Sequence, residues 1–170
     1  MPGNSLESRS FAPFRAAALL MMSLLCGAAL AQSMPLENLA HFPRTTLTIS
    51  TGGRLQRFRV WIADTPTREA QGLMFVRDLP ADEGMVFPMR PPQVAYFWMK
   101  NTYIPLDMLF IGTNGRIAKI IVNARPFSLA TLSSDVPVEA VIEIRGGEAK
   151  KLEFKVGQKV IWRMPAASAP

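Results

Sequence analysis

The sequence is poor in the residues that most enzymes use as nucleophiles, general bases and metal ligands. Its 170 residues include one cysteine, Cys26, and one histidine, His41. Cys26 lies in a segment that we expect to be removed, and the mature chain would then contain no thiol. Disulfides, thiol catalysis and thiolate metal sites are thereby excluded. His41 lies in a polar terminal segment, where a lone histidine is usually solvated, so the commonest nucleophile–base pairs cannot be built.

The first 31 residues have the three parts of a secretory signal peptide. Residues 1–15 are polar and carry two arginines, residues 16–25 form an apolar run broken by one serine, and Ala29-Leu30-Ala31 supplies small residues before a cut. The apolar run is well short of the ~20 residues that a membrane-spanning helix needs. We therefore expect cleavage after Ala31 and a periplasmic or secreted protein that has no stable membrane span once it is cleaved.

A lipid anchor on Cys26 is the alternative fate of this segment. Lipoprotein processing requires a small residue just before the modified cysteine, and Leu25 is large. We therefore reject a lipidated Cys26.

The charge of the mature chain limits its partners. Cleavage removes two arginines and one glutamate, so the formal net charge changes from +6 to +5. A basic chain can bind nucleic acid, but an exported protein is not expected to meet it. The basic residues are also scattered among acidic ones and do not form a run. Anionic envelope polymers or lipid head groups are the expected electrostatic neighbours. The composition does not predict an oligomeric state.

The first of two predicted hairpins turns at Gly52-Gly53 and spans residues 45–62. A two-residue turn pairs Thr51 with Arg54, and alternation on either side then places the apolar residues on one face. This face consists of Leu47, Ile49, Phe58, Val60 and Ile62.

The second predicted hairpin, residues 107–122, turns at Asn114-Gly115 and pairs Thr113 with Arg116. One face then holds Leu109, Ile111, Ala118, Ile120 and Val122, and the other Met108, Phe110, Ile117 and Ile121. Because both faces are apolar, both must be covered, as in a sandwich or a small closed barrel. Asp107 lies in register with the Leu109 face and needs a partner there, since an unpaired buried carboxylate is costly.

The remaining segments carry weaker signals. We expect a flexible arm over residues 32–44, a short helix between Asp64 and Gly72 capped by Asp64 or Thr65, a buried anchor at Leu73-Met74-Phe75, a short strand over 85–87 and a break at Pro91-Pro92. We further expect an irregular connection over 124–136, a strand over 137–145 with Glu139, Glu143 and Arg145 on a solvated face, a short helix over 148–152, a closing strand over 159–163 and a disordered tail over 164–170.

Five short blocks carry a resemblance to a known family. They are Gly72-Leu73-Met74-Phe75, Gly84-Met85-Val86-Phe87, Phe97-Trp98-Met99-Lys100-Asn101-Thr102, Ile104-Pro105-Leu106-Asp107 and Val156-Gly157. Their spacing resembles domain-of-unknown-function family 192, also called uncharacterised protein family 0127, over about residues 45–163. The resemblance implies one compact, mainly β domain, a β-sandwich or jelly-roll-like fold, and it implies no reaction and no cofactor. The residues themselves also allow a small barrel, with two short helices.

The same family often carries two cysteines in the connection after the second hairpin. Here that connection reads Pro126-Phe127-Ser128-Leu129-Ala130-Thr131-Leu132. A redox or metal role that depends on those cysteines is therefore not available to this chain.

The stretch from Phe97 to Asp107 concentrates the polar and aromatic chemistry. Lys100 and Asp107 flank a turn and are expected to form a buried ion pair, with Asn101 and Thr102 bonding loop amides. The catalytic alternative makes Lys100 a desolvated base or nucleophile, with Asn101 donating to an oxyanion. Ser133 or Ser134 would complete a serine–lysine arrangement, although no spacing signature supports one.

Binding is favoured over catalysis for this stretch. Trp98 and Tyr103 offer aromatic platforms, and Asn101 and Asp107 offer hydrogen-bonding groups for the hydroxyls of a sugar ring. We therefore interpret the protein as a non-catalytic module for a small molecule or envelope glycan, with Trp98, Lys100, Asn101, Thr102, Tyr103 and Asp107 as candidate ligand-binding residues.

A soft-metal site is the alternative binding function. The middle third of the chain contains Met74, Met85, Met89, Met99 and Met108. Thioethers suit Cu(I), and the face of Trp98 can cap such an ion. Packing in the core is the favoured role of these methionines, because methionine fills irregular gaps readily. We therefore expect a site without a metal or cofactor.

Overall fold

The computed structural model describes residues 36–164. The predicted signal peptide, residues 1–31, and the predicted tail from residue 165 on lie outside these described residues. Within them, no helix is long and apolar enough to cross a membrane.

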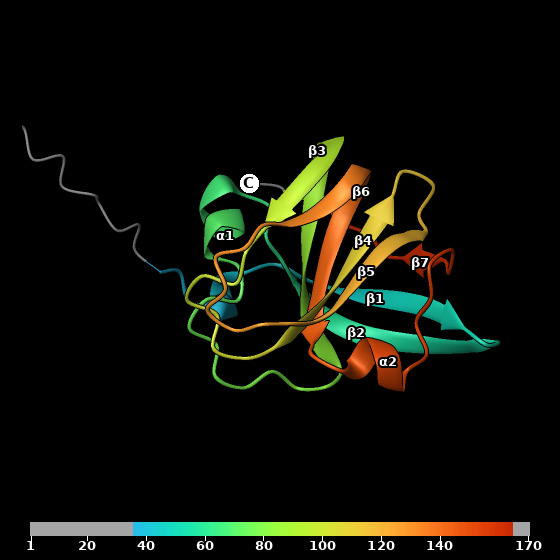
Figure 1. The fold of residues 1–170 in the computed structure, drawn as a ribbon, viewed down its shortest axis with the longest axis horizontal. Helices are drawn as coiled ribbons and strands as arrows, with labels where there is room; N and C mark the ends of the chain where they lie inside the picture. The colour runs from blue at the N-terminus through green and yellow to red at the C-terminus, as the bar shows by residue number, and fades with distance from the viewer. Residues whose placement is uncertain (1–35, 165–170) are drawn as a thin grey trace, which may run out of the picture. The chain divides into compact units, whose positions relative to one another are not determined.

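One seven-stranded sheet organises the described residues, which confirms the mainly β prediction (Figure 1). Its strands are β1 (Arg44–Thr51), β2 (Arg54–Ile62), β3 (Glu83–Phe97), β4 (Leu106–Gly112), β5 (Ile117–Ala124), β6 (Leu132–Arg145) and β7 (Val160–Ile161). The spatial order is β5-β4-β6-β3-β2-β1-β7. The neighbours are antiparallel except for β2 and β3, which are parallel and are joined through a crossover containing α1 (Pro66–Gln71).

The two edges of the sheet meet at one end. Arg116 and Lys159 form an isolated antiparallel bridge. The amide of Ile117 donates to the carbonyl of Gln158 at 3.0 Å, and the amide of Val160 donates to the carbonyl of Gly115 at 2.9 Å. The sheet therefore curls into a half-barrel, which is nearer to the predicted small barrel than to a sandwich of two sheets.

The first hairpin has the predicted register. Thr51 pairs with Arg54, Ile49 with Gln56 and Leu47 with Phe58. The predicted apolar face is confirmed, because all five of its residues are buried in one core cluster.

The second hairpin exists, but its predicted register holds only in the middle. Leu109 pairs with Ile120 as expected, whereas Ile111 pairs with Ile117 instead of Ala118. The amide of Gly112 donates to the carbonyl of Arg116, so the turn has three residues instead of two. This shift places Ile117 on the Leu109 face and corrects its predicted position.

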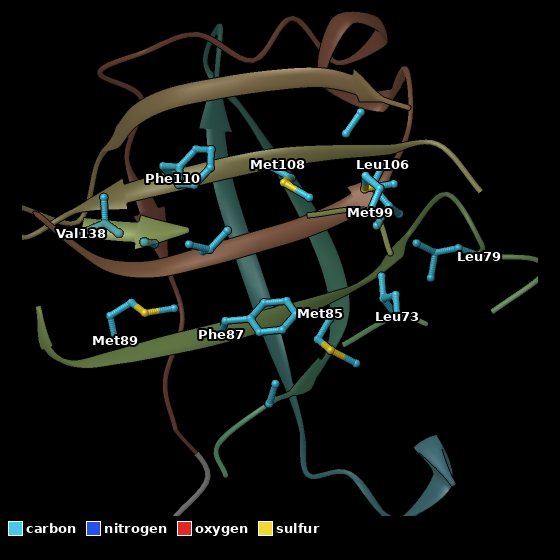
Figure 2. Packing of buried hydrophobic residues seen from close by; sticks show 14 of the residues in the cluster. Leu73, Leu79, Met85, Phe87, Met89, Met99, Leu106, Met108, Phe110 and Val138 are labelled. Carbon is cyan, nitrogen blue, oxygen red and sulfur yellow. The ribbon is translucent and has the colours of Figure 1, made fainter. Parts of the chain in front are cut away.

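Alternate residues of the central strands form two core clusters on opposite faces of the sheet. On one face, Leu109, Ile142 and Ile144 join the first hairpin's apolar residues, and α2 (Glu148–Lys151) packs there through Ala149. On the other face, Met85, Phe87, Met108, Phe110 and Val141 pack with Leu73 and Leu79 from the crossover (Figure 2). Strand β4 is thus buried on both sides, as predicted.

Strand β3 is longer than the expected strand over 85–87, and Pro91-Pro92 does not end it. Its pairing with β6 is interrupted between Pro88 and Gln93 and then resumes. Proline has no amide to donate, so the ladder skips these residues while the chain stays extended. The expected irregular connection over 124–136 is also shorter, because β6 already begins at Leu132.

Both predicted helices are present. In α1, Thr65 is the N-cap and its hydroxyl accepts a hydrogen bond from the amide of Arg68, Pro66 lies in the first turn, and Gly72 ends the helix at φ +49°. The expected anchor after it is only partly buried, since Leu73 is 2% exposed and Phe75 40% exposed.

The described part of the predicted flexible arm contacts the domain. Residues Leu39–His41 form η1, and Phe42 is buried in the core. The guanidinium of Arg68 donates to both carboxylate oxygens of Glu37, at 2.7 and 3.0 Å. These tertiary contacts have no periodic signature in the sequence.

Gly84 pairs with Ile144 of β6 at a position that leaves no room for a side chain. A β-carbon at this position would overlap the backbone carbonyl oxygen of Glu143. Because a paired strand cannot move away cheaply, we expect Gly84→Ala to lower the free energy of unfolding by about 3 kcal/mol. Chemical denaturation measures this change. Gly112→Ala is the control, since its β-carbon would come no closer than 3.3 Å to any atom, and that atom is a side-chain oxygen. Equal stability of the two variants would contradict the prediction.

Candidate functional site

The six predicted site residues do not form one site. Residues 98–105 make a loop between β3 and β4, and Trp98 and Lys100 are exposed on it. Thr102 is 5% exposed and Asp107 fully buried. The stretch therefore divides into an exposed part and a part that belongs to the core.

Asp107 is held by backbone amides and not by Lys100. One carboxylate oxygen accepts a hydrogen bond from the amide of Asn123, and the other from the amide of Ala149, both at 2.7 Å. The expected Lys100–Asp107 ion pair is wrong, because among the described residues Lys100 forms no salt bridge within 4 Å. The expected amides of Asn101 and Thr102 are also not its donors.

The second of these bonds explains how α2 begins. Ala149 is in the first turn of α2, whose N-cap, Gly147, has no side chain to accept a hydrogen bond. The carboxylate of Asp107 takes that place from the neighbouring strand, and a negative charge is favourable at a helix N-terminus. Asp107 is therefore a structural residue.

The other residues of the loop make local contacts. The ammonium of Lys100 lies 5.3 Å from the centre of the Trp98 ring, a cation–π arrangement on the surface. The hydroxyl of Thr102 donates to the carbonyl of Lys100 at 3.3 Å. The side-chain amide of Asn101 contacts the sulfur of Met74 at 3.9 Å. Tyr103 packs between Phe75 and Phe127.

The serine–lysine alternative is not assembled. Ser134 is buried, its hydroxyl donates to the carbonyl of Val136, and it accepts from the amide of Ala95. The hydroxyl of Ser133 accepts from the amide of Asp135. Within residues 36–164, no hydrogen bond joins either serine to Lys100.

The methionines line or fill the core. Met85, Met89, Met99 and Met108 belong to the core cluster that packs under the crossover (Figure 2). Of these, Met85, Met99 and Met108 are completely buried, whereas Trp98 is 52% exposed. Packing accounts for these side chains, in line with the favoured interpretation.

A cleft of about 490 Å³ opens beside the exposed part of the loop. Its walls come from the end of α1 and from β3, and they include Leu73, Phe87, Met89 and Phe97. Tyr96, Trp98 and Lys100 stand at its rim, with Tyr96 69% and Trp98 52% exposed. The size and largely apolar lining are those of a small-molecule site.

Glu143 lies on the floor of this cleft. It is 4% exposed, and its register neighbours are Met85 on β3 and Met108 on β4. Among the described residues its carboxyl group has no hydrogen-bond or ion-pair partner. Burial without a partner raises the pKa of Glu143 to about 8. At neutral pH the carboxyl group is therefore mostly protonated and can both donate and accept a hydrogen bond.

The predicted position of Glu143 on a solvated face is wrong, because the residue is 4% exposed. Alternation along β6 correctly places Glu143 on the opposite face of the sheet from Ile142 and Ile144. The pattern does not reveal which residues cover the face that carries Glu143. That face is the floor of the cleft, roofed by residues from α1 and the crossover. The available signal was the double-sided burial of the neighbouring hairpin, which requires a cover over both faces of the sheet.

Asp107→Asn tests the structural role of Asp107. An asparagine has one oxygen and one amide nitrogen, so one of the two backbone donors would face another donor. We expect the free energy of unfolding to fall by on the order of 3 kcal/mol. Denaturant unfolding measures the loss. Asp135→Asn, at an exposed carboxylate paired with Lys119, is the control and should leave stability almost unchanged, because exposed ion pairs contribute little. Unchanged stability of Asp107→Asn would make this residue a functional candidate again.

The protonation of Glu143 predicts a pH dependence of stability. The unfolded chain ionises this group near 4.5, whereas the folded protein keeps it protonated up to about 8. In this interval the folded state binds more protons, so the free energy of unfolding falls as the pH rises. Glu143→Gln should remove this fall. Above pH ~8 the free energy of unfolding of the variant should exceed that of the wild type by on the order of 4 kcal/mol.

Unfolding curves at pH ~5, ~7 and ~9 measure this dependence. Glu139→Gln, on the same strand but outside the cleft, is the control and should keep the wild-type pH profile. A Glu143→Gln profile as steep as that of the wild type would show that Glu143 is ionised in the folded state.

The comparisons with known proteins agree on the family. Residues 47–162 match domain-of-unknown-function family 192, described as Uncharacterized ACR. A protein of unknown function from Novosphingobium aromaticivorans is 38% identical, with a TM-score of 0.71 over 78% of this chain and 94% of that chain. A candidate transcription regulator from Sinorhizobium meliloti is 37% identical, with a TM-score of 0.69 over 71% of this chain and 95% of that chain. A search of curated proteins finds no match. The chain therefore belongs to domain-of-unknown-function family 192.

Proposed function

We propose that the protein is a non-catalytic binding module of the cell envelope that holds a small, largely apolar molecule in the cleft over Glu143. The observation that carries the proposal is the carboxyl group of Glu143, which is almost completely buried, faces an open apolar cleft and has no hydrogen-bond partner among the described residues. A buried polar group without a partner costs stability. A ligand in the cleft can supply the hydrogen bond that the protein itself does not provide to Glu143.

The cleft offers a ligand two kinds of contact. Leu73, Phe87 and Phe97 provide apolar walls, and Glu143 provides one hydrogen-bonding group at the bottom. A few polar groups in a mostly apolar pocket usually fix the orientation of a ligand. The proposed ligand therefore has an apolar body and a polar end, either a hydrogen-bond acceptor or donor or a cation that keeps Glu143 ionised.

A glycan cannot bind in the predicted way, stacked on Trp98 with its hydroxyls bonded to Asp107. Both carboxylate oxygens of Asp107 already accept hydrogen bonds from backbone amides, and the residue is fully buried. Asp107 is therefore not available to a sugar stacked on Trp98. A sugar ligand would have to pair the exposed Trp98 with groups at the rim of the cleft.

Acid–base catalysis is the second candidate function. A carboxyl group with a pKa near 8 in an apolar cleft matches the properties of a general acid or base at neutral pH. Lys100 and Asp107, the pair considered from the sequence, do not meet and do not support a hydrolase. A catalytic role would therefore centre on Glu143.

The proposal is tested by titrating the protein with small molecules while melting temperature and affinity are followed. The panel contains fatty acids, fatty alcohols, alkyl amines, monosaccharides and Cu(I). We expect at least one amphiphile to raise the melting temperature, because a ligand of the folded state stabilises it. Ala70 lines the cleft, so Ala70→Trp narrows the cleft itself. Glu143→Gln and Ala70→Trp should each weaken the binding of this amphiphile by about tenfold or more.

Glu139→Gln is the matched control, and it should bind as the wild type does. Binding that survives both cleft variants would place the ligand elsewhere and overturn the proposal. Cu(I) binding that depends on methionine would support the soft-metal alternative. Conversion of a bound compound that is lost in Glu143→Gln would establish the enzyme instead of the binding module.

A further inference from the structure

Three loops, two of which also contribute residues to the cleft, lie against one another and form a surface beside it. They are residues 72–82, 98–105 and 125–131. The amide of Phe75 donates to the carbonyl of Asn101 at 2.9 Å, and the amide of Phe127 donates to the carbonyl of Thr102 at 3.3 Å. The backbone of these loops is therefore tied together across long sequence separations.

These loops present large apolar side chains to solvent. The ring centres of Phe75 and Tyr103 are 5.9 Å apart, and those of Tyr103 and Phe127 are 5.3 Å apart. Phe75 is 40% exposed, Phe127 58% and Leu129 67%. Phe75, Tyr103 and Phe127 form a connected group, and Leu129 follows two residues after Phe127 on the same loop. We call Phe75, Tyr103, Phe127 and Leu129 the aromatic loop surface. Scattered exposed apolar residues are ordinary, but a contiguous group indicates an interaction site.

The backbone holds two of these aromatic residues in an unfavourable conformation. Phe75 has a φ of +65° and Phe127 a φ of +60°, in the left-handed region that bulky residues rarely adopt. Such strain persists only where the surroundings enforce it, and it is common at functional sites. Here the hydrogen bonds between the loops enforce it, and both phenyl rings remain partly in solvent.

Each of the three loops also carries an exposed basic side chain. The guanidinium of Arg77 lies 4.7 Å from the centre of the Tyr103 ring, and Lys100 and Arg125 are exposed on the other two loops. The acids in the three loops are Asp78 and Asp82, and Asp82 pairs with Arg59. The surface therefore combines exposed aromatic and aliphatic groups with an excess of positive charge.

We propose that the aromatic loop surface docks the protein onto an anionic lipid bilayer. Phe75, Phe127 and Leu129 would enter the head-group region, and Arg77 and Arg125 would contact lipid phosphates. Aromatic rings and basic side chains are the groups that anchor proteins at a membrane interface. Basic residues near an anionic bilayer add attraction that decreases within a Debye length. This surface is distinct from the cleft floor, so the inference does not depend on the proposed ligand.

A lipid surface fits these features better than a protein partner does. The apolar groups are few and project from loops, which suits shallow insertion into head groups. The basic residues are interspersed with them, so each apolar contact brings a cation close to the lipid phosphates. The predicted export to the envelope would also place the chain next to such bilayers.

Vesicle flotation tests the proposal, with vesicles of phosphatidylglycerol and phosphatidylcholine compared with vesicles of phosphatidylcholine alone. The protein is the chain from Gln32 to Pro170, which retains every strand of the sheet and both core clusters. We expect binding to the anionic vesicles only, and a decrease in binding when the salt is raised from ~0.1 M to ~0.5 M.

Phe75→Asn with Phe127→Asn removes both rings without adding backbone strain, because asparagine tolerates a positive φ. This double variant should bind at least about tenfold less. Arg77→Gln with Arg125→Gln should weaken binding and reduce its salt dependence. The matched controls are Leu55→Ser, at an exposed residue of the β1–β2 hairpin, and Arg57→Gln, at an exposed basic residue of β2. Both should bind as the unchanged chain does.

Three results would overturn the proposal. They are no flotation with anionic vesicles, equal flotation of the double asparagine variant and the control, or self-association that disappears in the double asparagine variant. The last result would show that the surface is an interface between two copies of the chain. Circular dichroism of each variant confirms that the fold is retained, so that lost binding reports on the surface.

Discussion

The carboxylate of Asp107 is the interaction on which the arrangement of the second half of the domain depends. It lies on β4 and accepts one hydrogen bond from the amide of Asn123 in β5 and one from the amide of Ala149 in α2. A helix of four residues has no stability of its own. Because Gly147 offers no cap, the start of α2 requires an acceptor from elsewhere in the fold. Asp107 supplies it, and the chain after β6 is thereby directed across the core face formed by the first hairpin.

The contrast between Asp107 and Glu143 explains why one buried acid is structural and the other is available. They occupy neighbouring pairs of the same ladder, since Asp107 lies opposite Ile144 and Met108 lies opposite Glu143. Their side chains point to opposite faces. Asp107 meets a helix start with free amides, whereas Glu143 is flanked in register by Met85 and Met108. A carboxyl group is therefore held as a hydrogen-bond acceptor by backbone amides on one face of the sheet. On the other face, burial raises the pKa of the carboxyl group of Glu143 to about 8.

Local signals in the sequence predicted the parts of the fold that depend on neighbouring residues. The Gly52-Gly53 hairpin and the caps of α1 follow from turn and capping chemistry, which acts over a few residues. Alternation also predicted that Asp107 is interior and needs a partner. The partner, the amide of Ala149, is 42 residues away, and no local pattern identifies it. Glu143 was missed for a related reason, because the alternation of one strand does not reveal what the crossover places above it.

The position of β7 has a consequence for the order in which the domain can be completed. This two-residue strand pairs with β1, so the last strand of the sheet lies beside the first. The hydroxyl of Thr45 also donates to the carbonyl of Arg163, 118 residues further along the chain. During synthesis these partners become available only when nearly the whole chain has left the ribosome. Contacts of such long sequence separation slow folding. The edge of β1 therefore stays open until synthesis is almost finished, and the curled sheet can close only as the last step of folding.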